Sequence, residues 1–338
     1  MFILINIGRF LKKSFLTLWL IGSTTWAVLA VNFGDSNSST VQLTIALLVA
    51  LIGLVATVTL LLSSALRKQL LMIHTVIFFI VLVWWLTIQP ANDRLWQADV
   101  RKLAHASVEG SLVTVHNIRN FTYHSEFEYQ PNYYDKTFNL NKLEGIDLFA
   151  VYWMGPAIAH IIISFDFGEN NHLAVSIEAR KEAGEGYSTI KGFFRQYELI
   201  YIVADERDVI GLRTHYRKDP PEQVYRYRLK TSKAAKENAR RLFLEYIDSI
   251  NTLYKEPAFY NTILANCTSV IWLHTRVNPG HLPFSWKILL SGYVPEYLYE
   301  SGRLEKQLSL TEIRNQAHIN PLVEEHEISA LFTETIRP

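Results

Sequence analysis

The stretch AIAHIIISFDFGENNHLAVSIEAR, residues 157–180, decides the fold of the larger part of this chain. Residues 158–167 are almost continuously apolar, and residues 173–177 are rich in β-branched side chains, so both segments read as strands. The polar run from Gly168 to His172 lies between them and allows the chain to turn back. The stretch therefore predicts a β-hairpin.

The hairpin brings His160 and Glu178 to one face of the predicted sheet. If Phe167 opposes Leu173, paired residue numbers sum to 340, and His160 and Glu178 are diagonal neighbours. A sum of 338 places them directly opposite each other, whereas an odd sum separates them onto different faces. Two other interpretations stay open: His160 is a packing residue of the core, or Glu178 forms an ion pair with Arg180, Lys181 or Arg207.

Further elements flank the hairpin. Residues 111–118 alternate apolar and polar side chains, and residues 197–204 are rich in β-branched residues, so both should add strands to the sheet. Residues 233–253 carry apolar side chains at three- and four-residue spacing, and a second helix is expected over residues 267–276. We therefore expect an α+β domain in which an antiparallel sheet packs on helices.

The sequence contains a single cysteine, Cys267, directly after Asn266. Asn is a favoured N-cap residue, so the thiol should lie in the first turn of the second helix. Helix N-termini stabilise anions, so we expect a lowered pKa for this thiol and main-chain amides that can bind an oxyanion. The alternative is a cysteine that only fills space in the core.

Cys267, His160 and Glu178 form a candidate catalytic group. A nucleophilic cysteine needs a base to remove its proton, and the base needs a third polar group to orient it. His160 fits the role of base and Glu178 the role of orienter. Candidates for substrate binding or the oxyanion site are Asn266, Thr268, Arg180 and Tyr260. The sequence has no HExxH, paired CxxC, phosphate loop or GxSxG, so we expect no metal and no cofactor.

Two segments are dense in mixed charge, residues 177–182 and residues 204–208. Such runs usually mark a solvated face, and a location at the site is the alternative.

The first ninety residues contain three apolar stretches without charged side chains, at residues 15–33, 41–62 and 70–88. Each is near the roughly 20 residues that a helix needs to cross a bilayer. A cleaved signal peptide is the alternative for the first stretch, but two further spans follow it closely. We expect a membrane anchor at residues 1–90 and one extracytoplasmic domain with a C-terminal extension at residues 91–338.

Basic residues set the expected orientation. Arg9, Lys12 and Lys13 precede the first span, Arg67 and Lys68 lie between the second and third, and residues 34–40 carry only Asp35. By the positive-inside rule the N-terminus is cytoplasmic and residue 90 onward is periplasmic. Of 33 basic and 32 acidic residues, five basic ones and one acidic one lie in this anchor, which leaves 28 basic and 31 acidic. This acidic excess argues against nucleic-acid binding.

The order of a strand histidine, a hairpin and a later Asn-Cys at a helix start resembles permuted papain-like enzymes, including NlpC-type hydrolases and lecithin retinol acyltransferase. A closer resemblance is to the periplasmic catalytic domain of the bacterial lipoprotein N-acyltransferase (Lnb-type) family, over roughly residues 95 to 275. The residues that carry it are Asn117-Ile118-Arg119-Asn120-Phe121, Ala159-His160, Ser164-Phe165, Ser176-Ile177-Glu178-Ala179-Arg180, Tyr197-Glu198-Leu199, Asp205-Glu206-Arg207-Asp208 and Asn266-Cys267-Thr268.

The resemblance implies a permuted papain-like fold with Cys267 as nucleophile, His160 as general base and Glu178 as its orienter. It also implies an inner-membrane thiol acyltransferase that moves an acyl group from a phospholipid, through a thioester, to a lipoprotein or another envelope amine. One departure stands out, because the membrane helices precede the domain here whereas in that family a membrane bundle follows it. The alternatives are a Cys-His hydrolase of peptide, amide or ester bonds and a non-catalytic envelope scaffold.

Overall fold

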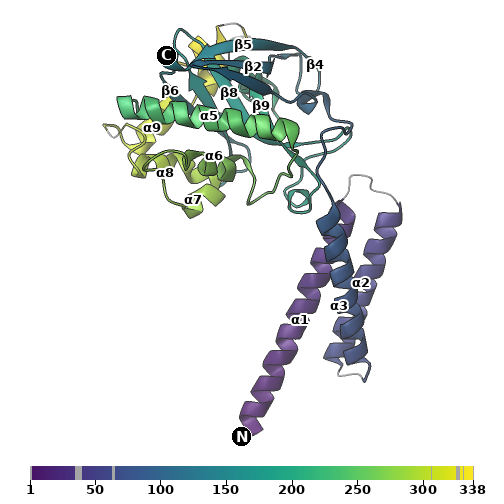
Figure 1. Ribbon diagram of the computed structural model, residues 1–338. Helices are drawn as coiled ribbons and strands as arrows, with labels where there is room; N and C mark the ends of the chain where they lie inside the picture. Colours follow the sequence, from purple (N-terminus) through teal and green to yellow (C-terminus); the bar gives the residue numbers. More distant parts are fainter. Residues whose placement is uncertain are drawn as a thin grey trace. The chain divides into compact units, whose positions relative to one another are not determined.

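The computed structural model describes residues 2–34, 40–62, 65–305, 307–324, 328–329 and 331–337 (Figure 1). The chain divides into two compact units. One contains residues 1–91 together with the segment Tyr187–Tyr197, and the other contains Asn92–Gly186 and Glu198–Pro338. Each unit is described by itself below.

The first unit contains three helices that are long and apolar enough to cross a membrane, α1 (Phe2–Phe33), α2 (Thr40–Leu61) and α3 (Arg67–Thr87). They contain or closely overlap the three predicted spans, so the presence of three spans is confirmed, although α1 begins well before residue 15. Ala30, Val49 and Val81, one from each helix, are buried in a common apolar cluster. Most of the connection at residues 34–40, including Asp35, lies outside the described residues. The segment Tyr187–Tyr197 contains a short 3₁₀ helix, η3 (Lys191–Phe193).

An eight-stranded sheet forms the centre of the second unit, in the order β1-β2-β9-β8-β7-β6-β10 with β5 paired to β2. All neighbours are antiparallel except β2 and β9. The mixed α+β class that the sequence predicts is therefore confirmed. The strands are β1 (His105–Glu109), β2 (Leu112–Arg119), β5 (Tyr133–Asn139), β6 (Gly145–Tyr152), β7 (Ala159–Asp166), β8 (His172–Arg180), β9 (Glu198–Ala204) and β10 (Gln223–Arg228), and a separate pair is β3 (Thr122–Tyr123) with β4 (Tyr129–Gln130).

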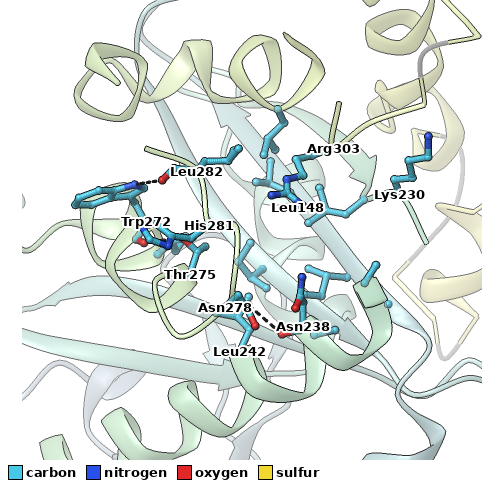
Figure 2. A pocket seen from close by; sticks show the side chains of 18 of the residues that line it. Leu148, Lys230, Asn238, Leu242, Trp272, Thr275, Asn278, His281, Leu282 and Arg303 are labelled. Atoms are coloured by element: carbon cyan, nitrogen blue, oxygen red, sulfur yellow. Dashed lines mark hydrogen bonds between the residues drawn. The ribbon is translucent and has the colours of Figure 1, made fainter. Parts of the chain in front are cut away.

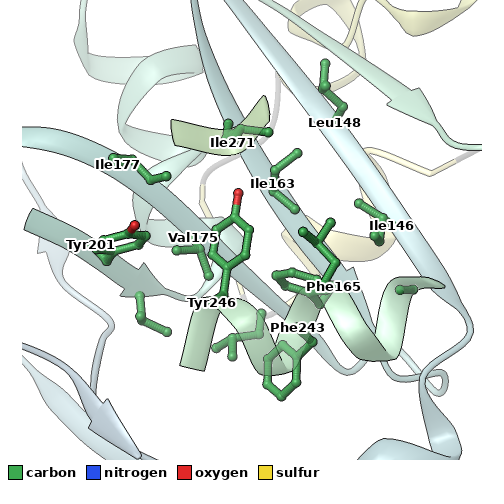
Figure 3. Packing of buried hydrophobic residues seen from close by; sticks show 14 of the residues in the cluster. Ile146, Leu148, Ile163, Phe165, Val175, Ile177, Tyr201, Phe243, Tyr246 and Ile271 are labelled. Carbon is green, nitrogen blue, oxygen red and sulfur yellow. The ribbon is translucent and has the colours of Figure 1, made fainter. Parts of the chain in front are cut away.

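One face of the sheet is covered by two helices, α5 (Lys233–Lys255) and α6 (Cys267–Thr275) (Figure 1). α5 begins at the N-cap Ser232, whose side chain accepts a hydrogen bond from the Ala235 amide. Its apolar stripe includes Phe243 and Tyr246, which pack on the strands beneath (Figure 3). This face holds the larger apolar core of the domain.

The opposite face is covered by short helices and the C-terminal segment. Its core joins residues of α4 (Glu206–Val209), α10 (Asn320–Val323) and α11 (Phe332–Thr335) to Phe149, Ile162 and Ile200 of the sheet. Because β7 is buried on both faces, it reads as a continuous apolar run instead of an alternating one. The remaining helices are η1 (Ala98–Val100), η2 (Leu140–Lys142), η4 (Leu212–Tyr216), α7 (Trp286–Leu289), η5 (Ser291–Tyr293), α8 (Val294–Glu300) and α9 (Leu310–Ala317).

The hairpin of β7 and β8 forms in the second of the two predicted registers. Phe165, not Phe167, opposes Leu173, and paired residue numbers sum to 338. The first register is wrong because the Phe167 amide already belongs to the turn, where it donates to the Asn171 carbonyl. Gly168 has a φ of 74° there, which glycine adopts without strain.

The charge-dense run at residues 205–208 is not a solvated face. Glu206 and Asp208 are almost fully buried. Arg337 donates hydrogen bonds to Glu206, and Arg119 donates to both carboxylate oxygens of Asp208. Each buried carboxylate is paired with a guanidinium, so removal of one partner would leave an uncompensated buried charge.

Candidate active site

Cys267 is the first residue of α6, as the sequence predicts. The Asn266 side chain caps the helix by accepting hydrogen bonds from the amides of Thr268 and Ser269, at 2.9 Å and 2.8 Å. Those two amides are therefore already occupied. The Cys267 amide, at the first helical position, has no hydrogen-bond acceptor among the residues that the structure describes. It is the main-chain donor that α6 can offer to an oxyanion.

The sheet opens at the position of Cys267. β7 and β8 pair from Asp166 opposite His172 to Ile162 opposite Ser176. Beyond this point β7 pairs only with β6, as far as Ala159, and β8 pairs only with β9, as far as Arg180. A gap between two adjacent strands results.

The Cys267 sulfur lies at this gap. The Phe167 amide points toward β8, because it donates to the Asn171 carbonyl. Amides at every second residue of a strand point the same way, so the Ile161 amide also points toward β8. With β8 no longer paired, this amide is free of a strand partner and lies close enough to the Cys267 sulfur to lower the pKa of the thiol. The Thr268 Oγ1 atom lies 3.6 Å from the same sulfur.

Burial raises the pKa of the Cys267 thiol. Hydrogen bonds from Ile161 and Thr268 oppose this effect, and the negative charge of Glu178 adds to it. The expectation of a thiol with a lowered pKa is therefore wrong, because desolvation and a nearby carboxylate outweigh the helix N-terminus. The resting thiol is neutral at neutral pH, so it needs a base when it reacts.

His160 and Glu178 share a face of the sheet and are joined through Ser176. The His160 Nε2 atom lies 2.7 Å from the Ser176 Oγ atom, which donates to the Glu178 Oε1 atom at 2.7 Å. The direct distance from His160 Nε2 to Glu178 Oε1 is 3.6 Å. Glu178 is thus in position to orient His160 through a hydroxyl group.

Two arginines complete the surroundings of Glu178. Arg213, on η4, lies 3.3 Å from the Glu178 carboxylate and 3.2 Å from that of Glu222, and Arg217 also pairs with Glu222. Burial would raise the pKa of Glu178, but Arg213, His160 and Arg217 together hold it well below its usual range. The carboxylate is therefore ionised at neutral pH.

Burial lowers the pKa of His160 to about 3. Arg213 and Arg217 act in the same direction, and Glu178 opposes them. The imidazole is consequently neutral at neutral pH and free to accept a proton. With the Nε2 atom used by Ser176, the Nδ1 atom remains for a reacting thiol.

The thiol and the imidazole belong to opposite faces of the sheet. Cys267 packs against the core under α5 and α6, whereas Ser176, the partner of His160, shares its face with Ala174 of the other core. No hydrogen bond joins Cys267 to His160 within the described part of the chain. On its own face, the Cys267 sulfur is close to Ile161, the residue next to His160 in β7.

The other predicted residues have different surroundings. The Arg180 guanidinium is buried and donates to Asn92 and to the carbonyls of Val100 and Arg101, so it holds residues 92–101 against β8. Tyr260 is buried in the loop before α6. Sequence reasoning missed Ser176 and Arg213. Ser176 could have been found once the register was fixed, since it lies between Glu178 and Ala174 on the same face as His160, but no local pattern singles out Arg213.

An apolar cavity of about 190 Å³ lies near the start of α6, although Cys267 itself is not among its lining residues (Figure 2). Thr268, which contacts the Cys267 sulfur, is one of its lining residues. The apolar lining comes from β7, α5, α6 and the helices that follow, and polar side chains lie around it. Among the lining residues are Ile163, Leu242, Ile271, Trp272, Lys230 and Arg303. Within the described residues, no group of three or more His, Cys, Asp or Glu side chains is placed to hold a metal ion.

Part of the chain is similar to a known protein family. Residues 129–292 match the family model described as the Lnb N-terminal periplasmic domain. The resemblance to Lnb-type proteins is thereby confirmed over a stretch that includes His160, Glu178 and Cys267. No curated protein and no solved structure matches the chain. Together with the three apolar helices, the match indicates an inner-membrane protein with a periplasmic domain.

Proposed function

We propose that this protein, whose residues 129–292 resemble the Lnb N-terminal periplasmic domain, is a membrane-anchored thiol acyltransferase. Cys267 accepts an acyl group from a phospholipid and passes it to the amino group of a lipoprotein or of another envelope amine. The N-terminus is cytoplasmic, and the reaction takes place at the periplasmic side. A permuted papain-like relationship is part of the proposal and is supported by the strand position of His160 and the helix-start position of Cys267.

The observation that carries the proposal is the apolar cavity that is lined by Thr268, the residue directly after Cys267. An acyl chain gains about 0.8 kcal/mol for each CH₂ group that leaves water, whereas a polar peptide gains little from such a lining. Thr268 both lines the cavity and contacts the sulfur. A chain in the cavity would therefore present its carbonyl carbon near Cys267.

The first step is acylation of the thiol. The His160 Nδ1 atom takes the thiol proton as the sulfur attacks the ester carbonyl, and Glu178, through Ser176, stabilises the imidazolium that forms. The Cys267 amide donates to the oxyanion of the tetrahedral intermediate. The intermediate collapses when the lysolipid alkoxide leaves with the proton from His160, and the thioester remains.

The second step transfers the acyl group. The amine nitrogen attacks the thioester carbonyl while His160 removes one of its protons. The C–S bond breaks, the amide product leaves, and the Cys267 sulfur regains its proton from His160. His160 must accept a proton in both steps, and the charge of Glu178 raises its pKa toward that role, against burial and the two arginines.

The test is intact mass spectrometry of the purified protein in phospholipid nanodiscs. We expect a fatty-acyl adduct that hydroxylamine removes, that is absent in Cys267→Ala, and that forms much more slowly in His160→Ala. An added lipopeptide with a free amino terminus should consume the adduct and gain the acyl mass. If water clears the adduct equally fast without the amine, the protein is a hydrolase. Absence of any adduct would refute acyl-enzyme formation from phospholipid.

A further inference from the structure

The segment Tyr187–Tyr197, between β8 and β9, belongs to the unit of the membrane-spanning helices. Phe194 is 5 % exposed in the apolar cluster at the ends of α1 and α3. Its ring lies 6.3 Å from that of Trp26 and 6.4 Å from that of Phe33. The Trp85 Nε1 atom also donates to the Phe194 carbonyl at 3.3 Å. The segment is therefore packed against these helices by both apolar and polar contacts.

Arg195 fixes the segment to the end of α3. Its Nη1 atom donates to the carbonyls of Trp85, Leu86 and Ile88, at 3.1 Å, 3.2 Å and 2.9 Å, and its guanidinium stacks 4.2 Å from the Trp85 ring. The last carbonyls of a helix lack partners within the helix, so Arg195 caps α3. Its φ of 62° is unfavourable for a side chain with a Cβ atom. The anchor thus holds the segment in one defined conformation.

The same segment exposes large apolar side chains. Tyr187 is 51 %, Ile190 is 54 % and Phe193 is 36 % exposed. Lys191 lies between Ile190 and Phe193, with its Nζ atom 5.7 Å from the centre of the Phe33 ring. Aromatic rings, an aliphatic side chain and a lysine at the end of a membrane helix are typical of the boundary between lipid and water.

We propose that Tyr187–Tyr197 is an interfacial segment that inserts Ile190 and Phe193 into the lipid of the outer leaflet of the inner membrane. α3 leads into the periplasmic domain, so the carbonyls that Arg195 caps are at the periplasmic surface of the membrane. The segment packs against helices that face lipid, so phospholipid is the partner that we expect for its exposed apolar side chains. Lys191 and the Tyr187 ring remain at the level of the headgroups, and the side chains of Ile190 and Phe193 lie deeper.

Nitroxide accessibility tests this proposal. In a Cys267→Ser background, Ile190→Cys is spin-labelled in full-length protein, reconstituted at one copy per phosphatidylethanolamine and phosphatidylglycerol nanodisc. Power saturation then compares access of oxygen, which concentrates in lipid, with access of a water-soluble nickel chelate. The lipid control is Leu51→Cys in α2, which is 55 % exposed, and the water control is Phe127→Cys, which is 87 % exposed.

We expect position 190 to resemble position 51, with oxygen access high and nickel access low. Tyr187→Cys provides a second site and should give a value between the two controls. Nickel access at position 190 equal to that at position 127 would overturn the proposal. Protection from both reagents would also overturn it, because that result indicates contact with protein, such as a second copy of the chain, instead of lipid.

Discussion

The His160 Nε2 atom and the Ser176 Oγ atom lie 2.7 Å apart, and this contact links the candidate base to Glu178. The serine hydroxyl can accept from the imidazole and donate to the carboxylate at the same time. This arrangement leaves the Nδ1 atom of His160 as the proton acceptor. The orientation of the base therefore depends on a residue that is not itself titratable.

Ser176→Ala should slow formation of the acyl adduct about ten- to a hundredfold, since a hydrogen bond to a charged group contributes about 1.5–3 kcal/mol. The thiol and the carboxylate remain, so some activity should persist. Intact mass spectrometry over time measures the rate. Ser164→Ala is the matched control, because it removes another buried hydroxyl of the sheet that bonds Glu206 instead. An unchanged rate in Ser176→Ala would show that the hydroxyl does not position His160.

Glu178→Gln should change two reactions of Cys267 in opposite directions. The negative charge of Glu178 raises the pKa of the thiol, so its removal should increase alkylation by iodoacetamide at pH 8 severalfold. Acyl transfer should fall, because His160 loses the charge that stabilises its protonated form. Cys267 is the only cysteine, so all alkylation reports on it. Glu182→Gln is the control, and a rise or a fall of both rates together would contradict this account.

The stability of the domain should depend on the protonation of His160 below pH 6.5. Burial lowers the pKa of His160 to about 3 from its ordinary value of 6.5, so the unfolded chain takes up the proton first as the pH falls. The stabilisation is complete above pH 6.5 and is lost progressively toward pH 3. Between pH 6.5 and pH 5, the free energy of unfolding of His160→Asn should therefore fall by about 2 kcal/mol less than that of the wild type.

Denaturant unfolding of the protein in detergent at several pH values measures this difference. His274→Asn provides a comparison, because burial lowers the pKa of His274 to about 4 and its removal should flatten the curve in the same direction. Equal pH slopes for His160→Asn and the wild type would show that His160 does not stay neutral in the folded protein.

Ala239→Phe should reduce acylation by long-chain donors while sparing short-chain donors. Ala239 is 2 % exposed on α5 and lines the apolar cavity, so a phenyl group there would occupy the space of a chain. Rates with palmitoyl and acetyl donors are compared on the same preparation, which separates filling of the cavity from partial unfolding. Leu244→Phe, on the exposed side of α5, is the control. An equal loss with both donors would contradict an acyl-chain role for the cavity.

Local patterns were sufficient for the elements that carry the site. β7 follows from its apolar run, and the start of α6 follows from Asn266, because both depend on residues close in sequence. The shared face of His160 and Glu178 was also predictable, since it is the same in both even-numbered registers. The register itself was not, because it depends on the turn, where the Asp166 side chain accepts from the Gly168 amide.

Properties that depend on distant residues could not be predicted. The raised pKa of Cys267 results from burial by the assembled sheet and helices, whereas its helix position alone predicts the reverse. Arg213 reaches Glu178 from the short helix η4, which no periodic pattern marks in the sequence. The same limit applies to the C-terminal extension, whose mixed charges give no sign of their partners in the sequence.

Arg337, in the C-terminal extension, pairs with carboxylates that are distant in sequence. Its guanidinium lies 2.7 Å from Asp147 and 2.5 Å from Glu206, and both carboxylates are almost fully buried. Removal of one partner of a buried ion pair leaves an uncompensated charge, so Arg337→Ala should lower the free energy of unfolding by about 3–5 kcal/mol. Arg337→Lys should restore only part of it, because an ammonium group cannot bridge two carboxylates with the same geometry.

Denaturant unfolding monitored by circular dichroism measures the change, with Lys255→Ala as the control because Lys255 is exposed at the end of α5. Arg226 still pairs with Asp147 in the variant, so most of the loss should come from Glu206. Arg337→Ala combined with Glu206→Gln should therefore recover stability relative to Arg337→Ala alone. A loss below about 0.5 kcal/mol in Arg337→Ala, which is the range of ordinary surface substitutions, would mean that the extension does not stabilise the domain through this contact.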